Sequence, residues 1–211
     1  APSALEIAAA LHGSDLDTEA VAVARRILWL TLLPRLPARS DPCQLAEVLE
    51  RNILSGNTLT GEVWPGGTRP FDVVLGNPPY RRELGAKPLL DAIADSDLGR
   101  RHRAPRMDLW YYFLHRGLEL LAPGGRLGFI VGAYWSAGTG ADRLIAVLRE
   151  TVHVEEIFQL DRLQVFPGIS GRHMLLIISK TPPGGSTTIR LPVSGAAADA
   201  RPFVEGRSPV H

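Results

Sequence analysis

Two kinds of apolar pattern alternate along this chain. One is a short strand-like run bounded by turn residues, of which FDVVL at 71–75 is the clearest and is typical of a buried strand. The other repeats apolar residues at intervals of three and four, which predicts an amphipathic helix. The strand pattern covers residues 11–17, 53–54, 71–75, 126–131, 154–160 and 173–179, and the helix pattern covers residues 18–33, 45–50, 107–121 and 139–151.

This alternation predicts an α/β fold with a doubly wound, mostly parallel sheet. Ligands of such sheets bind outside the carboxyl ends of the strands. Asp15, Asn57 and Asn77 each follow an apolar run. We therefore expect these three side chains at the ligand-binding edge.

Two stretches lack a clear pattern. Residues 81–106 are polar and weakly periodic, which predicts a long loop with one short helix near residues 89–94. From residue 181 onward Pro, Gly, Ser and Ala dominate, as they do in linkers and weakly ordered termini. We therefore expect one folded domain over residues 1–180 and a linker or tail over residues 181–211.

Composition narrows the class of protein. The 211 residues, 45% of them hydrophobic, can bury a sizeable core. A net charge of +1 gives no global attraction to nucleic acid, so any contact with DNA must be local. The single cysteine, Cys43, excludes a disulfide framework and fits a reducing cytoplasm. The histidines show no metal-ligand spacing, so we expect no catalytic metal, and no apolar stretch approaches the roughly 20 residues of a membrane helix.

The segment from Asn77 to Tyr80 carries the strongest chemical signal. Pro78 and Pro79 fix two φ angles and remove two N–H donors, so the segment presents carbonyl oxygens on a rigid loop. The side-chain oxygen of Asn77 is a further acceptor, and the ring of Tyr80 offers a flat face for stacking. Two acceptors beside an aromatic ring suit a planar group that carries an exocyclic amine. A proline-rich turn with a buried tyrosine is the structural alternative.

Five segments, which occur in the same order as in the family, resemble the N6-adenine DNA methyltransferases of bacterial restriction-modification and phage-defence systems. GNPPY after the strand resembles their catalytic signature. The other four similar segments are GSDLDTEAVAVAR at 13–25, NILSGNTL at 52–59, the helix and strand at 107–131, and VFPGISGRHMLLIIS at 165–179. The resemblance implies a fragment of a Rossmann-like, class I catalytic domain. It implies transfer of a methyl group from S-adenosylmethionine to N6 of adenine in double-stranded DNA.

The same resemblance implies a cofactor site at the first two strand ends. Asp15 would accept hydrogen bonds from the ribose hydroxyls of S-adenosylmethionine, with Leu16 as a neighbouring contact. Asn57 would lie near the adenine of the cofactor. A solvated turn acid at Asp15 and a simple turn residue at Asn57 are the alternatives.

It also implies a target-base site. Asn77 and the Pro78 carbonyl would accept hydrogen bonds from the target amine, on a turn that Pro79 keeps rigid. Tyr80 and Phe166 would hold the two faces of a base flipped out of the duplex. Ordinary core packing is the alternative for Phe166.

A run of basic residues follows the tetrapeptide. Arg100, Arg101 and Arg103 stand in the sequence GRRHRAPR at 99–106. They could bind DNA phosphates beside the flipped base. A solvated, mobile loop is the alternative.

The glycine-rich first motif of the family has no counterpart in residues 1–10, APSALEIAAA. We therefore expect this chain to lack the first strand of the fold. Other domains or subunits would supply the glycine-rich cofactor loop and the recognition of the target sequence.

Two alternative functions stay open. The same tetrapeptide serves methyltransferases that act on a protein glutamine or on the amine of an RNA base. A non-catalytic DNA-binding subunit would explain the lack of the first motif. A nicotinamide-dependent enzyme is disfavoured because its glycine fingerprint is absent.

Overall fold

The computed structural model describes residues 2–64, 70–79, 87–134, 140–160, 163, 172–192 and 204–205. The chain divides into two compact units, Ala1–Gly67 and Thr68–His211. Across the described ranges, no helix has both the length and the apolar character that crossing a lipid bilayer requires.

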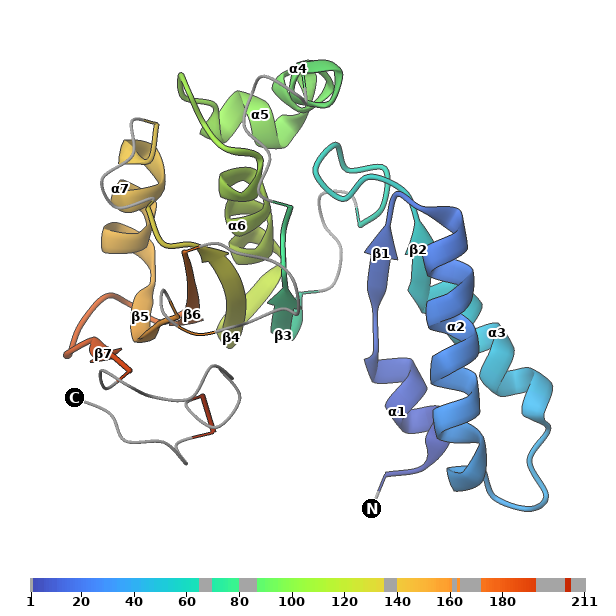
Figure 1. Cartoon of the computed structure of the whole chain (residues 1–211). Helices are drawn as coiled ribbons and strands as arrows, with labels where there is room; N and C mark the ends of the chain where they lie inside the picture. The colour runs from blue at the N-terminus through green and yellow to red at the C-terminus, as the bar shows by residue number, and fades with distance from the viewer. Residues whose placement is uncertain are drawn as a thin grey trace. The chain divides into compact units, whose positions relative to one another are not determined.

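The first unit is a pair of parallel strands packed against helices. β1 (Gly13–Asp15) pairs in parallel with β2 (Ile53–Ser55), as Figure 1 shows at the blue end of the chain. The helices are α1 (Ala4–Ala10), α2 (Thr18–Leu32), the 3-10 turn η1 (Leu33–Arg35) and α3 (Pro42–Asn52). The buried core of this unit consists of Ala4, Ala8, Val21, Leu32, Leu45, Leu49 and Ile53.

Local interactions explain where these elements begin and end. The side chain of Asp17 caps α2, because it accepts hydrogen bonds from the backbone N–H groups of Glu19 and Ala20. The guanidinium of Arg25 in α2 donates to the carbonyl oxygen of Ile53, with the Nε contact at 2.9 Å. This contact ties α2 to the end of α3 and the start of β2, and the predicted helix over 18–33 is confirmed.

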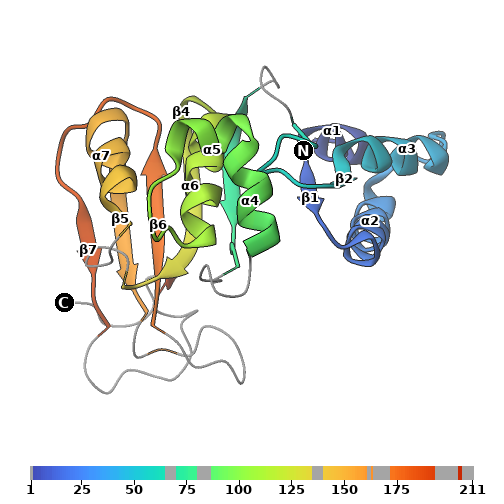
Figure 2. The ribbon, with the colours of Figure 1, turned by 90° about the horizontal axis from the view of Figure 1, so that it is seen from above.

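The second unit is built on one five-stranded sheet with the strand order β3-β4-β6-β5-β7. Figure 2 shows these strands side by side. β4 is parallel to β3, β7 is parallel to β5, and β6 runs antiparallel to both of its neighbours. The strands are β3 (Phe71–Gly76), β4 (Leu121–Gly132), β5 (His153–Gln159), β6 (His173–Ser179) and β7 (Thr188–Arg190).

Helix α6 (Leu109–Leu120) packs on β3 and β4, whereas α7 (Asp142–Thr151) packs on β5. Gly117 permits the close approach of α6, since a Cβ there would lie 2.6 Å from Leu127 Cδ1. At the other end of the helix, Lys180 Nζ donates to the carbonyl oxygens of Leu118 and Leu121, both at 2.7 Å. These bonds satisfy carbonyl groups that a helix end leaves without partners.

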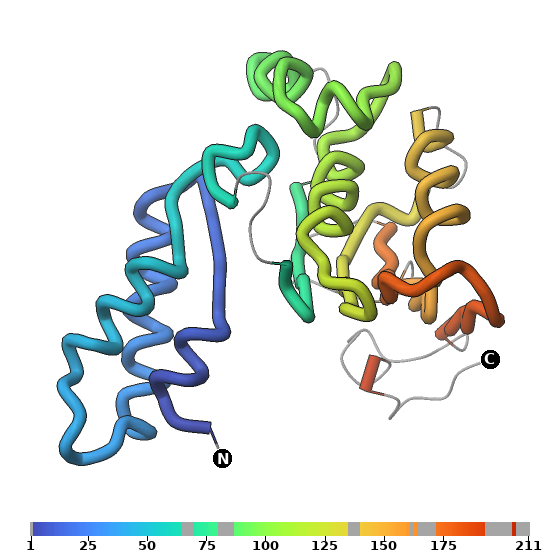
Figure 3. The backbone as a smooth tube through the Cα atoms, turned by 180° about the vertical axis from the view of Figure 1, so that it is seen from behind, coloured from blue at the N-terminus to red at the C-terminus, as the bar shows by residue number. Residues whose placement is uncertain are grey.

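The α/β class is confirmed, and the sheet is mixed because β6 runs against its neighbours. The short helix predicted near residues 89–94 is confirmed as α4 (Lys87–Asp95), whereas the loop expected after it is wrong, because residues 97–102 form a second helix, α5 (Asp97–His102). Figure 3 shows these two helices next to each other. Gly99 brings their backbones together, since a Cβ there would collide with the Ile93 carbonyl oxygen. The polar, weakly periodic sequence of this region contains no local signal for the contact between α4 and α5.

β7 lies within residues 181–211, the segment that we expected to be a linker or tail. It pairs with β5 along three positions, from Thr188 to Arg190. Arg190 also donates to Glu156 Oε2 at 2.7 Å. The sheet therefore extends past residue 180.

Candidate functional site

The carboxyl ends of β1 and β2 bring the predicted cofactor residues together. The backbone N–H of Gly56 donates to the Asp15 carbonyl oxygen at 2.9 Å, immediately before Asn57. The hydroxyls of Ser14 and Thr58 are 2.5 Å apart and link the same two strand ends. The expected neighbourhood of Asp15 and Asn57 is therefore present within the first unit.

The chemistry of this edge fits a ribose-bearing cofactor. Asp15 is exposed, and its Oδ1 accepts from the backbone N–H of Asp17 at 2.9 Å. A carboxylate has about four acceptor positions, so this single bond leaves Asp15 able to accept from a diol. The next residue, Leu16, has 60% of its surface exposed and presents an apolar side chain to solvent.

Two hydrogen bonds within its own turn hold Asn57 in place. Its side-chain oxygen accepts from the backbone N–H of Leu59 at 2.9 Å, and its own N–H donates to Glu62 Oε2 at 2.9 Å. The amide donor of Asn57 is therefore the group that it can best offer to a ligand.

The Asn77-Pro78-Pro79 turn begins directly after β3, which ends at Gly76. Asn77 and Pro79 are exposed, whereas Pro78 is buried. Pro78 is therefore packed against the protein, whereas the residues on either side of it face solvent. The predicted partners Tyr80 and Phe166 lie outside the described residues.

Other groups reach the same edge of the sheet. Gly76 is paired with Phe129, and β4 continues from there to Gly132. Just beyond Gly132, the Tyr134 hydroxyl donates to Asp108 Oδ2 at 2.9 Å. Asp108 stands at the N-terminus of α6 and is only 8% exposed. The sequence did not predict this pair, although an acid at the start of a long helix was a visible signal.

The arginines of 99–106 do not stand in a loop throughout, so that part of the prediction is wrong. Arg100 and Arg101 belong to α5, whose first turn Ser96 caps. Arg100 pairs with Asp97, and Arg101 Nη2 lies 2.8 Å from Glu119 Oε1. Both side chains of the Arg100–Asp97 pair are exposed, so that pair is weak, whereas Arg101 binds a Glu119 side chain that is only 24% exposed.

Arg103 follows the helix as its C-cap and is exposed. Among the ion pairs of the described residues, none includes Arg103. Of the three arginines that we predicted to bind phosphate, Arg103 is therefore the one whose charge is most available to a ligand.

A polar cluster fastens α5 to α6. The rings of His102 and His115 stack with centroids 4.0 Å apart, and His102 Nε2 lies 3.0 Å from Glu119 Oε1. Burial and the neighbouring His102 lower the pKa of His115 to about 3. Burial alone would raise the pKa of Glu119, but hydrogen bonds from His102 and Arg101 outweigh it and lower that pKa to about 2. The cluster has a structural role, because it buries a neutral histidine against an ionised carboxylate.

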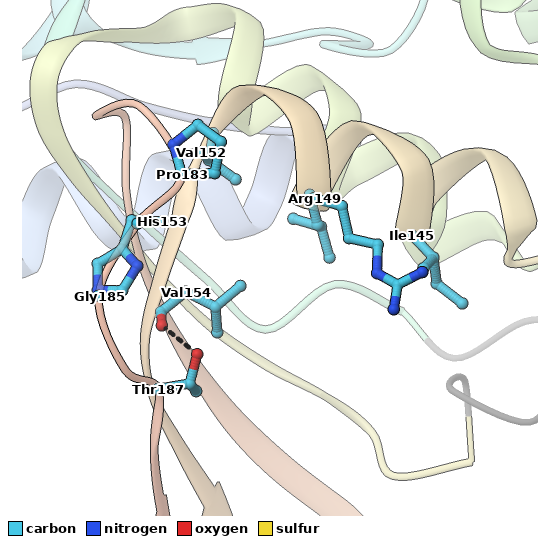
Figure 4. Close-up of a pocket in the computed structure, with 10 residues that line it drawn as sticks. Ile145, Arg149, Val152, His153, Val154, Pro183, Gly185 and Thr187 are labelled. Atoms are coloured by element: carbon cyan, nitrogen blue, oxygen red, sulfur yellow. Dashed lines mark hydrogen bonds between the residues drawn. The ribbon is translucent and has the colours of Figure 1, made fainter.

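An open pocket of about 330 Å³ lies elsewhere on the second unit (Figure 4). Its lining includes Ile145 and Arg149 of α7, and the hydroxyl of Thr187 donates to the Val154 carbonyl oxygen at 2.8 Å. β5 is parallel to β4 because both pair antiparallel with β6. The start of β5 at His153 therefore marks the edge opposite Asn77. Within the second unit, the candidate site is therefore the edge at Asn77, opposite this pocket.

Comparison with known proteins identifies the family. The sequence model of the Eco57I restriction-modification methylase family matches residues 9–166. This chain belongs to that family. The predicted relationship to methyltransferases of restriction-modification systems is thereby confirmed.

Curated relatives of this family member are longer proteins. The type II methyltransferase M.XhoI of Xanthomonas vasicola is 36% identical over 98 residues, which are 46% of this chain and 17% of that protein. The type II methyltransferase M.PaeR7I of Pseudomonas aeruginosa is 30% identical over 122 residues, or 56% of this chain and 20% of that protein. The chain thus spans about a fifth or less of these relatives.

Solved structures show the fold class. The M protein of the type I restriction enzyme EcoKI matches with a TM-score of 0.57 and 20% identity, over 94% of this chain and 42% of that one. A Listeria monocytogenes protein assigned to the class I S-adenosylmethionine-dependent methyltransferases matches with a TM-score of 0.56 and 18% identity, over 97% and 67%. The DrdV–DNA complex matches with a TM-score of 0.60 and 17% identity, over 92% and 22%. The family member has a class I methyltransferase fold, whose cofactor is S-adenosylmethionine.

Proposed function

We propose that this chain carries most of the catalytic domain of a DNA methyltransferase that modifies N6 of adenine in double-stranded DNA. The enzyme would act in the cytoplasm as part of a restriction-modification or phage-defence system. The observation that carries this proposal is the exposed Asn77 beside the buried Pro78, at the end of β3, in a member of a restriction-modification methylase family.

Asp15, Leu16 and Asn57 would hold the cofactor at the edge of β1 and β2. Bound S-adenosylmethionine supplies a methyl group on a sulfonium centre. The carboxylate of Asp15 accepts hydrogen bonds from a ribose diol, because charged acceptors bind hydroxyl pairs strongly. The exposed Leu16 side chain contributes apolar contact, and the amide of Asn57 donates to a ring nitrogen of the adenine.

Asn77 and Pro78 would orient the target amine. The lone pair of an adenine N6 is delocalised into the ring, so this nitrogen is a poor nucleophile. The Asn77 side-chain oxygen and the Pro78 carbonyl accept hydrogen bonds from the two N–H groups of this amine. These bonds favour a more tetrahedral nitrogen. The Pro78 carbonyl would be held in place before reaction, because Pro78 is buried and neither proline can rotate about φ. The contribution of the two acceptors is orientation together with electrostatic stabilisation of the transition state.

The target base must leave the duplex to reach this turn. Flipping costs a few kcal/mol in lost stacking and pairing. Stacking on Tyr80 and Phe166 would offset part of that cost, on the order of 1–3 kcal/mol per base. Arg100, Arg101 and Arg103 would hold the adjacent phosphates, with Arg103 the most available of the three.

Other polypeptide segments or subunits would complete the enzyme. Residues 1–10 contain no glycine-rich loop for the methionine end of the cofactor. The related type II methyltransferases are about five times as long as the matched segment or longer. We propose that such additional parts supply this loop and read the target sequence.

The substrate can be tested by competition in one assay. The complete product of the gene is incubated with methyl-labelled S-adenosylmethionine and equal amounts of duplex DNA, RNA and a glutamine-containing peptide. We expect label in DNA alone, and digestion should yield labelled N6-methyladenine. Label in the peptide or the RNA, or in a cytosine nucleoside, would contradict the proposed substrate.

A further inference from the structure

A second aromatic residue stands at the Asn77 edge. Tyr134 follows β4 by two residues, and 39% of its surface is exposed. β3 and β4 are parallel, and Gly76 is paired with Phe129. The residues after Gly76 and the residues after Gly132 therefore leave the sheet at the same edge.

The hydroxyl of Tyr134 is anchored by a buried carboxylate. Asp108 Oδ2 accepts this hydroxyl at 2.9 Å, and the side chain of Asp108 makes no capping bond to α6, whose N-terminus it occupies. The carboxylate of Asp108 therefore binds Tyr134, which follows β4, instead of capping its own helix.

The backbone is shaped around the ring of Tyr134. A Cβ at Gly132 would lie 2.7 Å from Tyr134 Cε1. Only glycine leaves room for the ring at this place, directly over the end of β4. The ring is therefore fixed at two points, by its hydroxyl and by the space over Gly132, while part of it stays exposed.

We propose that Tyr134 contacts the target base and forms an aromatic wall of its pocket, with Asp108 as its positioning residue. This inference rests on the proposed function and assigns a residue to the same site. A nucleobase is the substrate class that a fixed and partly exposed ring suits, because every base has a face that can stack. A tyrosine held by its hydroxyl loses little entropy when it stacks, which lowers the cost of binding.

The test uses the complete protein and duplex DNA with 2-aminopurine at the target adenine, whose fluorescence rises when the base leaves the stack. Tyr134→Ala should abolish most of this rise and raise KM for DNA about tenfold, as expected for one lost base–aromatic contact. The Kd of the cofactor should not change. Thr187→Val is the matched control, because it removes a single hydrogen bond at the opposite edge of the sheet.

Two variants test the role of Asp108. Asp108→Ala should raise KM for DNA because the ring loses its anchor, whereas Asp108→Asn keeps an acceptor and should restore KM. If both variants raise KM equally, or if both only lower the melting temperature, Asp108 has no positioning role.

The outcomes separate this inference from the proposed function. Adenine methylation and a fluorescence rise that are both unchanged in Tyr134→Ala would overturn the inference and leave the function intact. Absence of a rise with the wild-type protein would also overturn the inference. Absence of label in adenine with the wild-type protein would overturn the function, whatever the fluorescence shows.

Discussion

Gly76 lies directly against the ring of Phe129, and a Cβ at Gly76 would come within 2.9 Å of Phe129 Cε1. This contact fixes the last residue of β3 on β4, one position before Asn77. The polar turn therefore starts from a point that packing holds in place.

Gly76→Ala should damage both stability and catalysis. Overpacking at this contact should lower the free energy of unfolding by about 1–3 kcal/mol. The displaced turn should also lower kcat. Gly184→Ala is the control, because no atom lies within 4 Å of its added Cβ and its backbone is not in the left-handed region. Denaturant titration and methyl-transfer kinetics would measure the two effects, and equal behaviour of the two variants would contradict this account of Gly76.

Asp15→Ala should weaken cofactor binding without loss of fold. Removing a charged acceptor from a diol should raise the Kd of S-adenosylmethionine roughly tenfold or more. Asp17→Ala is the comparison two residues away, because Asp17 caps α2 and should affect stability rather than the cofactor. Isothermal titration of the complete protein measures the Kd. A larger effect at Asp17 than at Asp15 would remove Asp15 from the cofactor site.

Arg103→Gln should reduce the salt dependence of DNA binding. Each phosphate contact contributes about 0.9 to the slope of log K against log salt, so we expect the slope to fall by about that amount. Arg126→Gln is the matched control, since Arg126 is exposed on β4 far from the carboxyl edge and pairs with Glu155. If the two variants give the same slope, the basic segment does not bind phosphate.

The protein should lose stability as the pH falls below neutrality. The pKa of His115 is lowered from 6.5 to about 3, and that of Glu119 from 4.5 to about 2. In both cases the unfolded chain binds a proton at a pH where the folded chain does not, so the free energy of unfolding falls as the pH falls. The His115 contribution should be lost between pH 6.5 and 3, and the Glu119 contribution between pH 4.5 and 2.

Denaturant titrations at a series of pH values would resolve these two windows. Glu119→Gln should flatten the pH dependence below about pH 4.5, as linkage requires, and leave most of the fall between pH 6.5 and 5. An unchanged slope below pH 4.5 would show that the cluster of α5 and α6 does not govern acid sensitivity.

Much of the fold follows from local pattern. The predicted strand at 173–179 coincides with β6, and Asp17 caps α2 as its position indicated. These features depend on the period of apolar residues and on the chemistry of one cap, both of which are read within a few neighbouring positions.

The remaining features depend on contacts between distant residues. α5 carries a single apolar side chain, Leu98, and its place is set by Gly99 against α4 and by Arg101 against Glu119. The bond from Tyr134 to Asp108 spans 26 residues. β7 is a three-residue edge strand whose pairing with β5 determines its existence. No local pattern contains such partners, so these features could be found only in three dimensions.

The role of Asn77 is the central claim, and single-turnover methyl transfer to duplex DNA tests it most directly. The complete protein and its Asn77→Ala variant are saturated with labelled S-adenosylmethionine, and the rate of N6-methyladenine formation is measured. We expect the variant to be slower by at least about 100-fold, since loss of one preorganised hydrogen-bonding group costs about that much. Its cofactor Kd and its melting temperature should match the wild type. A variant rate within a few-fold of the wild-type rate would contradict the account.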